Sequence, residues 1–275
     1  MIDGLCLGLD VGSVSVDAAL VDGEGNIHWD CYRRHRGSPL TVAAEVIDEA
    51  MRRLEGRPLA GAAATGSGGK LVAEEIGGVF VNEIVAAARA CSALHPEART
   101  LIDMGGEDSK LIVFEPAAAG ALRVADFSMN TVCAAGTGSF LDEQAARLGL
   151  DIENQFGELA LQSENPPTLA GRCSVFAKTD MIHLQQLATP DYDIVAGLCF
   201  ALARTFRSNI GRGKDFSPPV VFQGGVASNA GMVRAFRDVL GLADGQLIIP
   251  EHHGVMGAIG AALELRAAPA DAERP

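Results

Sequence analysis

The sequence predicts an α/β protein made of two similar lobes. Its 275 residues exceed one ordinary domain. Hydrophobic residues make up 48% of the chain and charged residues 21%, which is the balance of a globular protein able to bury a core. The strongest observation is a recurring pattern. Residues 5–22 and residues 100–114 each read as an apolar strand, an aspartate, a glycine turn and a second apolar strand, which indicates a duplicated unit.

The charge and the apolar pattern exclude two classes of partner. The formal net charge is −13 and no basic cluster is present, so we expect no nucleic-acid partner. The chain enters its first strand without a basic leader, and its longest uncharged run, residues 216–233, is broken by prolines and glycines. We therefore expect no membrane partner. The six cysteines have no close pairs, which fits a reducing cytoplasm.

The first strand–turn–strand segment has the residues of a phosphate site. Asp10 ends the strand, and Gly12 and Ser13 form the turn. A carboxylate at this place can hold hydrated Mg²⁺, while backbone N–H groups, Ser13 and Ser15 hydrogen-bond phosphate oxygens. A plain β-hairpin has the same pattern, so the residues alone leave both interpretations open.

The rest of the N-terminal part alternates strands and helices. Residues 26–32 predict a third strand, and residues 41–54 predict an amphipathic helix. A short buried strand, 59–64, leads into the glycine-rich TGSGGK, which lacks P-loop spacing and reads as a glycine loop. A strand and an alanine-rich helix follow from residue 79.

Two later segments complete the expected nucleotide site. Asp103 belongs to the second copy of the pattern, and two such turns could hold a polyphosphate from opposite sides. A later apolar strand ends in Gly224 and Gly225, which let a nucleoside lie against the backbone. The helix that follows is capped by Ser228 or Asn229. The last helix, in PEHHGVMGAIGAALE, carries small residues that suit close packing against another helix.

Cys133 and Cys173 each stand at the start of a predicted helix, beside small residues. The first helix runs to Gly149, and the second runs from about residue 175 to 187. The free N–H groups and the macrodipole of a helix N-terminus favour an anion or a thiolate. The two cysteines are therefore candidate ligands of a metal cluster. Ordinary buried thiols and a shared Cys₄ zinc site are alternatives that the residues leave open. The other cysteines read as buried thiols: Cys6, Cys31, Cys91 and Cys199.

Six motifs carry a resemblance to a known family: LGLDVGS, DMGGEDSK, CAAGTGSFLD, CSVFAKTDM, QGGVASNAG and GAIGAAL. In one register from residue 5 to about 265, the chain resembles the acetate kinase, sugar kinase, Hsp70 and actin superfamily. Within it, the chain resembles the BadF/BadG/BcrA/BcrD ATPase family, of the 2-hydroxyacyl-CoA dehydratase activator type. The resemblance implies two ribonuclease H-like lobes with a nucleotide cleft between them. These would be residues 1–98 and residues 99–265, followed by a flexible tail, 266–275.

The resemblance implies an ATP-dependent one-electron donor. Cys133 and Cys173 of each chain would ligate one [4Fe–4S] cluster shared by a homodimer, which agrees with the four thiolates that a cubane needs. ATP hydrolysis would send a low-potential electron to a partner iron–sulfur enzyme such as a 2-hydroxyacyl-CoA dehydratase, and ferredoxin or flavodoxin would supply it. A benzoyl-CoA reductase or a double-cubane cluster protein is an alternative acceptor. The alternative of a different class is a small-molecule kinase of the sugar type, in which Asp103 would activate a substrate hydroxyl.

The resemblance also assigns roles to single residues. Asp10 would hold Mg²⁺, and Asp103 would orient or deprotonate the attacking water. Asp17 stands where the family often has a lysine, and Glu107 replaces a glutamine, so Mg²⁺ or Lys110 would have to screen Glu107 from the γ-phosphate. The ATP or ADP would contact Gly12, Ser13, Val14 and Ser15 at the β- and γ-phosphates, Gly105, Gly106 and Glu107 on the opposite phosphate side, Gly136, and Gly224, Gly225 and Asn229 at the adenosine.

Overall fold

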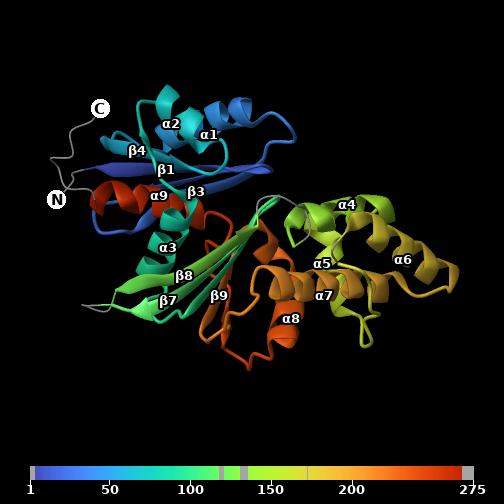
Figure 1. Ribbon diagram of the computed structural model, residues 1–275. Helices are drawn as coiled ribbons and strands as arrows, with labels where there is room; N and C mark the ends of the chain where they lie inside the picture. The colour runs from blue at the N-terminus through green and yellow to red at the C-terminus, as the bar shows by residue number, and fades with distance from the viewer. Residues whose placement is uncertain (1–3, 118–120, 131–135, 172, 268–275) are drawn as a thin grey trace. The chain divides into compact units, whose positions relative to one another are not determined.

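The computed structural model describes residues 4–117, 121–130, 136–171 and 173–267. It divides into two compact units, and each is built on one five-stranded mixed sheet with helices packed on it (Figure 1). The first unit comprises Met1–Glu97, Pro116–Arg123 and Gly254–Pro275, and the second comprises Ala98–Glu115 and Val124–His253. The predicted α/β class with two lobes is confirmed. Of the expected tail, residues 268–275 lie outside the described residues.

The first unit has a sheet with the strand order β3-β2-β1-β4-β5. Strand β1 pairs antiparallel with β2 and parallel with β4. This pairing places Asp10 of β1 beside Thr65 of β4, at the carboxyl ends of both strands. The elements are β1 (Leu5–Val11), β2 (Ser15–Val21), β3 (Ile27–Arg34), α1 (Pro39–Arg53), β4 (Leu59–Thr65), α2 (Gly69–Glu75), β5 (Val79–Phe80), α3 (Glu83–Leu94) and α9 (Met256–Ala267).

Helices cover both faces of this first sheet. Alternate residues of β1 point to opposite faces and pack against different helices. Leu5, Leu7 and Leu9 are buried against α1 and α2. Cys6, on the other face, is buried together with residues of α9 and α3. Full burial of one leucine side chain contributes about 2 kcal/mol, so each face adds to the stability of the unit.

Helix α9 joins the first unit because glycines allow its backbone to approach β1 and α3. A Cβ atom on Gly8 of β1 would overlap the carbonyl oxygen of Ala258. A Cβ atom on Gly260 would overlap the carbonyl oxygen of Ala86 in α3. The predicted close packing of this small-residue helix is confirmed. Helix α9 therefore belongs to the first unit, whereas the resemblance implies one lobe for residues 99–265.

The second unit has a sheet with the strand order β10-β9-β6-β7-β8. Strand β6 pairs antiparallel with β7 and parallel with β9, which places Asp103 next to Gln223. The elements are β6 (Thr100–Met104), β7 (Ser109–Pro116), β8 (Leu122–Asn130), α4 (Gly138–Leu148), the π-helix η2 (Ile152–Phe156), α5 (Gly157–Leu161), α6 (Ser174–Gln186), α7 (Asp191–Asn209), β9 (Val220–Gln223), the 3-10 helix η3 (Gly225–Ser228), α8 (Ala230–Leu240) and β10 (Leu247–Ile248).

The core of the second unit is one hydrophobic cluster between its sheet and its helices. Phe236 of α8 lies between Phe206 of α7 and Phe222 of β9, with ring centroids 5.3 and 4.8 Å away. Edge-on aromatic pairs of this kind contribute about 1 kcal/mol beyond their buried area. The cluster therefore fixes β9, and with it the glycine turn that follows Gln223.

Two helical segments were not predicted from the sequence. Helix α2 begins at Gly69, inside the TGSGGK segment that the sequence analysis reads as a loop, so that expectation is corrected. The amide of Gly68 donates to the carbonyl oxygen of Val11 over 2.8 Å and holds the start of α2 against β1. Residues 152–161 form η2 and α5, and the Asp151 carboxylate caps η2 by accepting from the amide of Glu153. Such short segments offer too few turns for a helical period to be recognised.

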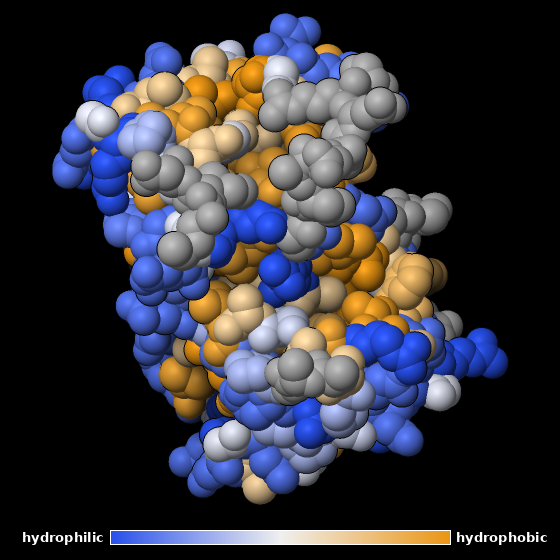
Figure 2. Space-filling view, turned by 90° about the vertical axis from the view of Figure 1, so that its left-hand side faces the viewer, coloured by the Kyte–Doolittle hydropathy of each residue, from blue (hydrophilic) through white to orange (hydrophobic). Residues whose placement is uncertain are grey.

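Several large apolar side chains lie at the surface. Figure 2 shows one face of the molecule, on which hydrophobic residues reach the surface between hydrophilic ones. Among the described residues, Val175, Phe176 and Leu187 of the α6 region are the most exposed of these, at 66%, 66% and 63%. Within the described part of the chain, no helix is long and apolar enough to cross a bilayer.

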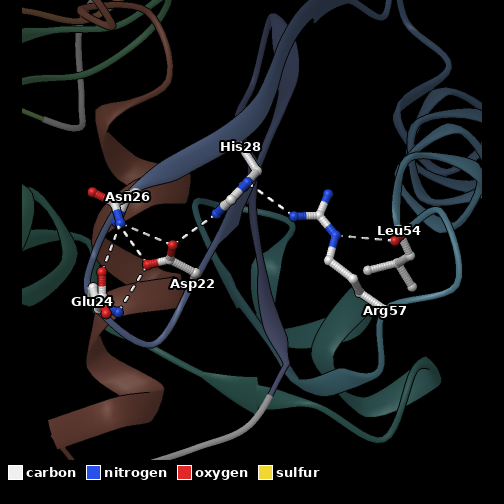
Figure 3. Close-up of polar contacts among 6 residues, drawn as sticks. All are labelled: Asp22, Glu24, Asn26, His28, Leu54 and Arg57. Carbon is white, nitrogen blue, oxygen red and sulfur yellow. Dashed lines mark hydrogen bonds and ion pairs between the residues drawn. The ribbon is translucent and has the colours of Figure 1, made fainter.

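A polar network closes the turn between β2 and β3 (Figure 3). The carboxylate of Asp22 accepts hydrogen bonds from the amides of Glu24 and Asn26, from Asn26 Nδ2, and from His28 Nε2 at 2.7 Å. Arg57 Nη1 lies 2.9 Å from His28 Nδ1. Because arginine can only donate, His28 Nδ1 accepts and its Nε2–H is donated to Asp22. Burial raises the pKa of Asp22, but the bonds from Asn26 and His28 outweigh it and hold the pKa below its usual range.

Replacement of this carboxylate should lower stability in a pH-dependent way. We expect Asp22→Asn to lower the free energy of unfolding at pH 7 by about 1–2 kcal/mol, because several hydrogen bonds to a charged acceptor are weakened. The folded-state pKa is depressed. The stabilisation is therefore complete above the unfolded-state pKa of about 3.9 and is lost as the pH falls below it. Denaturant unfolding between pH 3 and pH 7 checks this. Asp48→Asn, an equal charge change on exposed Asp48 of α1, should leave the curve near wild type.

Candidate functional site

The predicted first phosphate loop is a tight turn between β1 and β2. The amide of Gly12 donates to the carbonyl oxygen of Ser15 over 3.0 Å and closes the turn. The carbonyl oxygen of Val14 accepts from the amide of His35, also over 3.0 Å, so β3 holds the loop from outside. The predicted contact residues Gly12, Ser13, Val14 and Ser15 are all half-buried. The backbone of the loop is thus fixed, while part of each residue remains accessible.

Asp10 sits in a cradle formed by two glycines. A Cβ atom on Gly66 would overlap one carboxylate oxygen of Asp10, and a Cβ atom on Gly257 of α9 would overlap the other. The carboxylate can occupy this position only because both residues lack a side chain. Carboxylate oxygens are the ligands that Mg²⁺ prefers, so the residues present fit the predicted metal.

Asp17 changes the charge of this first loop. It is buried, and Ser15 Oγ lies 3.3 Å from its Oδ2. It is also the register partner of Asp10 across the antiparallel pair β1–β2. The loop therefore carries a buried acid. A bound cation would offset its charge near a phosphate.

The second phosphate loop closes in the same way as the first. The amide of Gly105 donates to the carbonyl oxygen of Asp108 over 3.0 Å, which matches the bond between Gly12 and Ser15 in the first loop. Lys110 is buried and forms an ion pair with Asp108. Glu107 is exposed at the tip of the turn. The two copies of the sequence pattern therefore share a backbone geometry as well as residues.

Asp103 is a half-buried carboxyl group with a perturbed proton affinity. Burial raises the pKa of Asp103 above its usual range, and the negative charge of Asp108 also raises it. The ammonium of Lys110 and the hydrogen bond from Gln223 act in the opposite direction without cancelling the effect of burial. A carboxylate with a raised pKa is better matched to accepting a proton near neutral pH.

The glycine turn after β9 lies at the same edge of the second sheet as Asp103. Gly224 adopts φ +89°, and a Cβ atom there would overlap the carbonyl oxygen of Met104. The amide of Gly224 donates to the carbonyl oxygen of His253 over 2.8 Å. Of the two caps left open by the sequence, Asn229 caps α8, because its Oδ1 accepts from the amide of Met232 at 3.1 Å.

A pocket of about 360 Å³ lies beside this turn in the second unit. One wall is polar and rigid. Arg234 Nη1 donates to the carbonyl oxygen of Ser163 over 2.7 Å, and the Arg234 guanidinium lies 5.8 Å from the ring centroid of Phe200. The pocket thus combines apolar walls with fixed donors. Its lining residues are Leu161, Ala227, Ser228, Ala230, Val233, Arg234 and Arg237.

Of the two predicted cluster ligands, Cys133 lies outside the described residues. Cys173 is the N-cap of α6, with extended backbone at φ −140° and ψ 126°, and its half-buried thiol is free. Burial raises the pKa of Cys91 and Cys199 to about 12, so these two are neutral packing thiols. Among the described residues, no group of three or more His, Cys, Asp or Glu side chains could hold a metal ion.

The start of α4 is hydrogen-bonded to the second phosphate loop. The amide of Gly138 donates to the carbonyl oxygen of Gly105 at 2.9 Å, and the amide of Ser139 donates to that of Gly106 at 2.7 Å. Ser109 Oγ donates to the carbonyl oxygen of Gly136 at 2.5 Å. The segment that follows Cys133 in the sequence is therefore fastened to the loop beside Asp103.

The structure groups the predicted site residues by unit. Asp10 and the first loop belong to the first unit. The second unit gathers Asp103, Gly105, Gly106, Glu107, Gly136, Gly224, Gly225 and Asn229. Sequence reasoning missed Gly66 and Gly257 around Asp10, and also Ser109 and Gln223. No local pattern marks these residues, because each acts on a residue of another segment.

The two mixed sheets, each with a strand–Asp–turn at the same position, define an α/β ATPase fold of the actin type. Residues 7–264 match the BadF/BadG/BcrA/BcrD ATPase family. Over 258 residues the chain is 31% identical to the (R)-2-hydroxyglutaryl-CoA dehydratase activating ATPase of Acidaminococcus fermentans. The match covers 92% of this chain and 94% of that protein. The predicted family is confirmed: the chain belongs to the BadF/BadG/BcrA/BcrD ATPases.

Two further likenesses point to the same branch of the family. The chain is 36% identical over 184 residues to the 2-hydroxyisocaproyl-CoA dehydratase activator of Clostridioides difficile, a match that spans 66% of this chain and 65% of that activator. The solved structure of the activator of the 2-hydroxyisocaproyl-CoA dehydratase from Clostridium difficile with bound ADPNP has a TM-score of 0.79 and 27% identity. The comparison covers 96% of this chain and 94% of that one.

Proposed function

We propose that the protein is an ATP-driven activator that donates single electrons to a partner iron–sulfur enzyme. The observation that carries the proposal is the hydrogen bonding between the second phosphate loop and the start of α4. Through it, a change in the bound nucleotide can move the start of α4, which follows Cys133 in the sequence. The similarity to dehydratase activators supports the same role.

ATP hydrolysis would use two carboxylates, Asp10 and Asp103, each of which stands at the end of a strand. Asp10 would hold Mg²⁺ in its glycine cradle, and the backbone amides of the first loop would bind the β- and γ-phosphates. Asp103 accepts a proton from the attacking water. The water oxygen bonds to the γ-phosphorus, the bond from that phosphorus to the bridging oxygen breaks, and ADP leaves. The same residues could serve a kinase, but the coupling to α4 would then have no use.

The adenosine would bind at the turn after β9. Gly224 and Gly225 allow a close approach to the backbone, and the pocket beside them has the size of a small ligand site. Asn229 keeps its Nδ2 without a partner among the described residues, although the side chain is buried. A nucleoside oxygen or ring nitrogen that reached this buried donor would supply the missing partner.

The electron-carrying group would be held by Cys133 and Cys173. Cys173 fits this role because its free thiol stands at the start of a helix, where backbone N–H groups favour an anionic cluster. One chain offers two such cysteines, so a homodimer is needed to supply the four ligands of a [4Fe–4S] cluster. When bound, the cluster supplies reversible one-electron chemistry. Ferredoxin or flavodoxin is the proposed donor, and a 2-hydroxyacyl-CoA dehydratase the proposed acceptor.

The coupling can be tested by amide hydrogen exchange in anaerobic protein with ATP, with ADP and without nucleotide. We expect residues 136–148 to exchange at different rates with ATP and with ADP, because the amides of Gly138 and Ser139 are bonded to the phosphate loop. Residues 194–206, the buried part of α7, serve as the control and should exchange equally. Equal exchange of residues 136–148 in both nucleotide states would contradict the proposal.

A further inference from the structure

Gln223 is a buried polar residue that contacts Asp103. It is the last residue of β9 and the register partner of Asp103 on β6. Gln223 Nε2 donates to Asp103 Oδ2 over 3.2 Å, and the side chain is only 1% exposed. The contact joins the two strand ends that carry the second phosphate loop and the glycine turn.

The orientation of the Gln223 amide is set by its partner. An ionised carboxylate only accepts hydrogen bonds, so the NH₂ group must face Asp103. Gln223 Oε1 is then left without a hydrogen-bond partner among the described residues. Burying an unpartnered acceptor lowers stability, and an apolar residue of similar size would avoid that loss. Packing alone therefore does not explain a glutamine at this position.

The other side of the Asp103 carboxylate is also confined. An ideal Cβ atom on Gly224 would lie 2.8 Å from Asp103 Oδ1. Oδ2 of Asp103 thus accepts from the Gln223 amide, and Oδ1 lies close to the backbone of Gly224. We propose that Gln223 is a positioning residue that fixes the orientation of the Asp103 carboxylate for ATP hydrolysis. The proposal rests on the role proposed for Asp103 above.

The charged groups that act on Asp103 are Lys110, its register partner on β7, and Asp108 in the turn before it. Lys110 lowers the pKa of Asp103 and Asp108 raises it, while the hydrogen bond from Gln223 lowers it. Loss of that bond must therefore raise the pKa of Asp103. A general base must be ionised to act, so the acid limb of the ATPase pH profile should move to higher pH.

The test is the pH dependence of kcat for Gln223→Met, which keeps the length of the side chain and removes the amide. We expect kcat at pH 7 to fall about ten- to hundredfold, and part of the loss to be recovered at alkaline pH. Gln144→Met is the matched control. Gln144 is also fully buried, and like Gln223 it has one amide atom without a partner among the described residues, in this case Nε2. It lies in α4 and makes no hydrogen bond to Asp103 among those described. An acid limb at the wild-type position in Gln223→Met would overturn the proposal.

A second variant, Gln223→Glu, keeps the shape but places a carboxyl group against Asp103. It should move the acid limb further than Gln223→Met does, because like charges disfavour ionisation. If Gln223→Met does not fold, the Gln223→Glu variant alone tests the proposal: an acid limb at higher pH than in the wild type supports it, and an unshifted one overturns it. Asp103→Asn separates the two proposals. Loss of hydrolysis in Asp103→Asn with wild-type profiles in both Gln223 variants refutes only the positioning role, whereas hydrolysis that survives Asp103→Asn refutes the role of Asp103.

Discussion

Asp103→Asn should lower the kcat for ATP hydrolysis by about 10²–10⁴-fold, because a general base or water-orienting group contributes that much. Nucleotide affinity should stay equal or rise slightly, since the change removes a negative charge near the γ-phosphate. The variant keeps the shape of the side chain, so the protein should fold. Steady-state phosphate release together with ATP titration by calorimetry checks both parts.

A matched control exists in the same unit. Asp215→Asn makes the same chemical change at an exposed residue outside the site and should hydrolyse ATP at the wild-type rate. Hydrolysis by Asp103→Asn within about twofold of the wild type would remove Asp103 from the mechanism. A kinase would show the opposite selectivity, with phosphate transferred to a sugar faster than to water.

Cys173→Ala should remove the iron from anaerobically purified protein. A cubane cluster needs four thiolates, and loss of Cys173 from both chains of a dimer leaves two. We expect about four irons and four sulfides per wild-type dimer and almost none in the variant. ATP binding should be kept, because Cys173 is not one of the proposed nucleotide contacts. Iron and sulfide analysis with anaerobic absorption spectra measures this.

Cys31→Ala serves as the control for that experiment. Cys31 is half-buried like Cys173, but it lies on β3 in the first unit, and burial raises the pKa of its thiol. Its replacement should leave the iron content unchanged. A Cys173→Ala variant that keeps its iron would refute the cluster assignment. Colourless wild-type protein that holds zinc would favour the alternative Cys₄ site.

Features set by neighbouring residues were predictable from the sequence. Gly149 ends α4 in the left-handed conformation, which glycine adopts without strain. The cap of α8 was narrowed to Ser228 or Asn229, and Asn229 fills it through a bond within its own turn. The recurrence of the strand–Asp–glycine pattern likewise predicted both strand–turn–strand loops. In each case the physical cause lies within a few residues, so a pattern in the chain records it.

Features set by register were not predictable. Gln223 and Asp103 are 120 residues apart, and only the parallel pairing of β9 with β6 makes them neighbours. The cradle of Asp10 likewise depends on Gly66 and Gly257, which come from β4's end and from α9. A glycine in a helix or after a strand can be needed for several different purposes. Only the residue that packs against it, which the structure reveals, shows which purpose applies.

The most direct test of an ATP-driven electron donor is a rapid-mixing experiment. The reduced protein is mixed anaerobically with an oxidised 2-hydroxyacyl-CoA dehydratase, and the electron paramagnetic resonance signal of the reduced protein is followed with ATP, with ADP and with ADPNP. We predict that the signal is lost, and the dehydratase reduced, with ATP but not with ADP or ADPNP. Electron transfer at the same rate without nucleotide would contradict the proposed function.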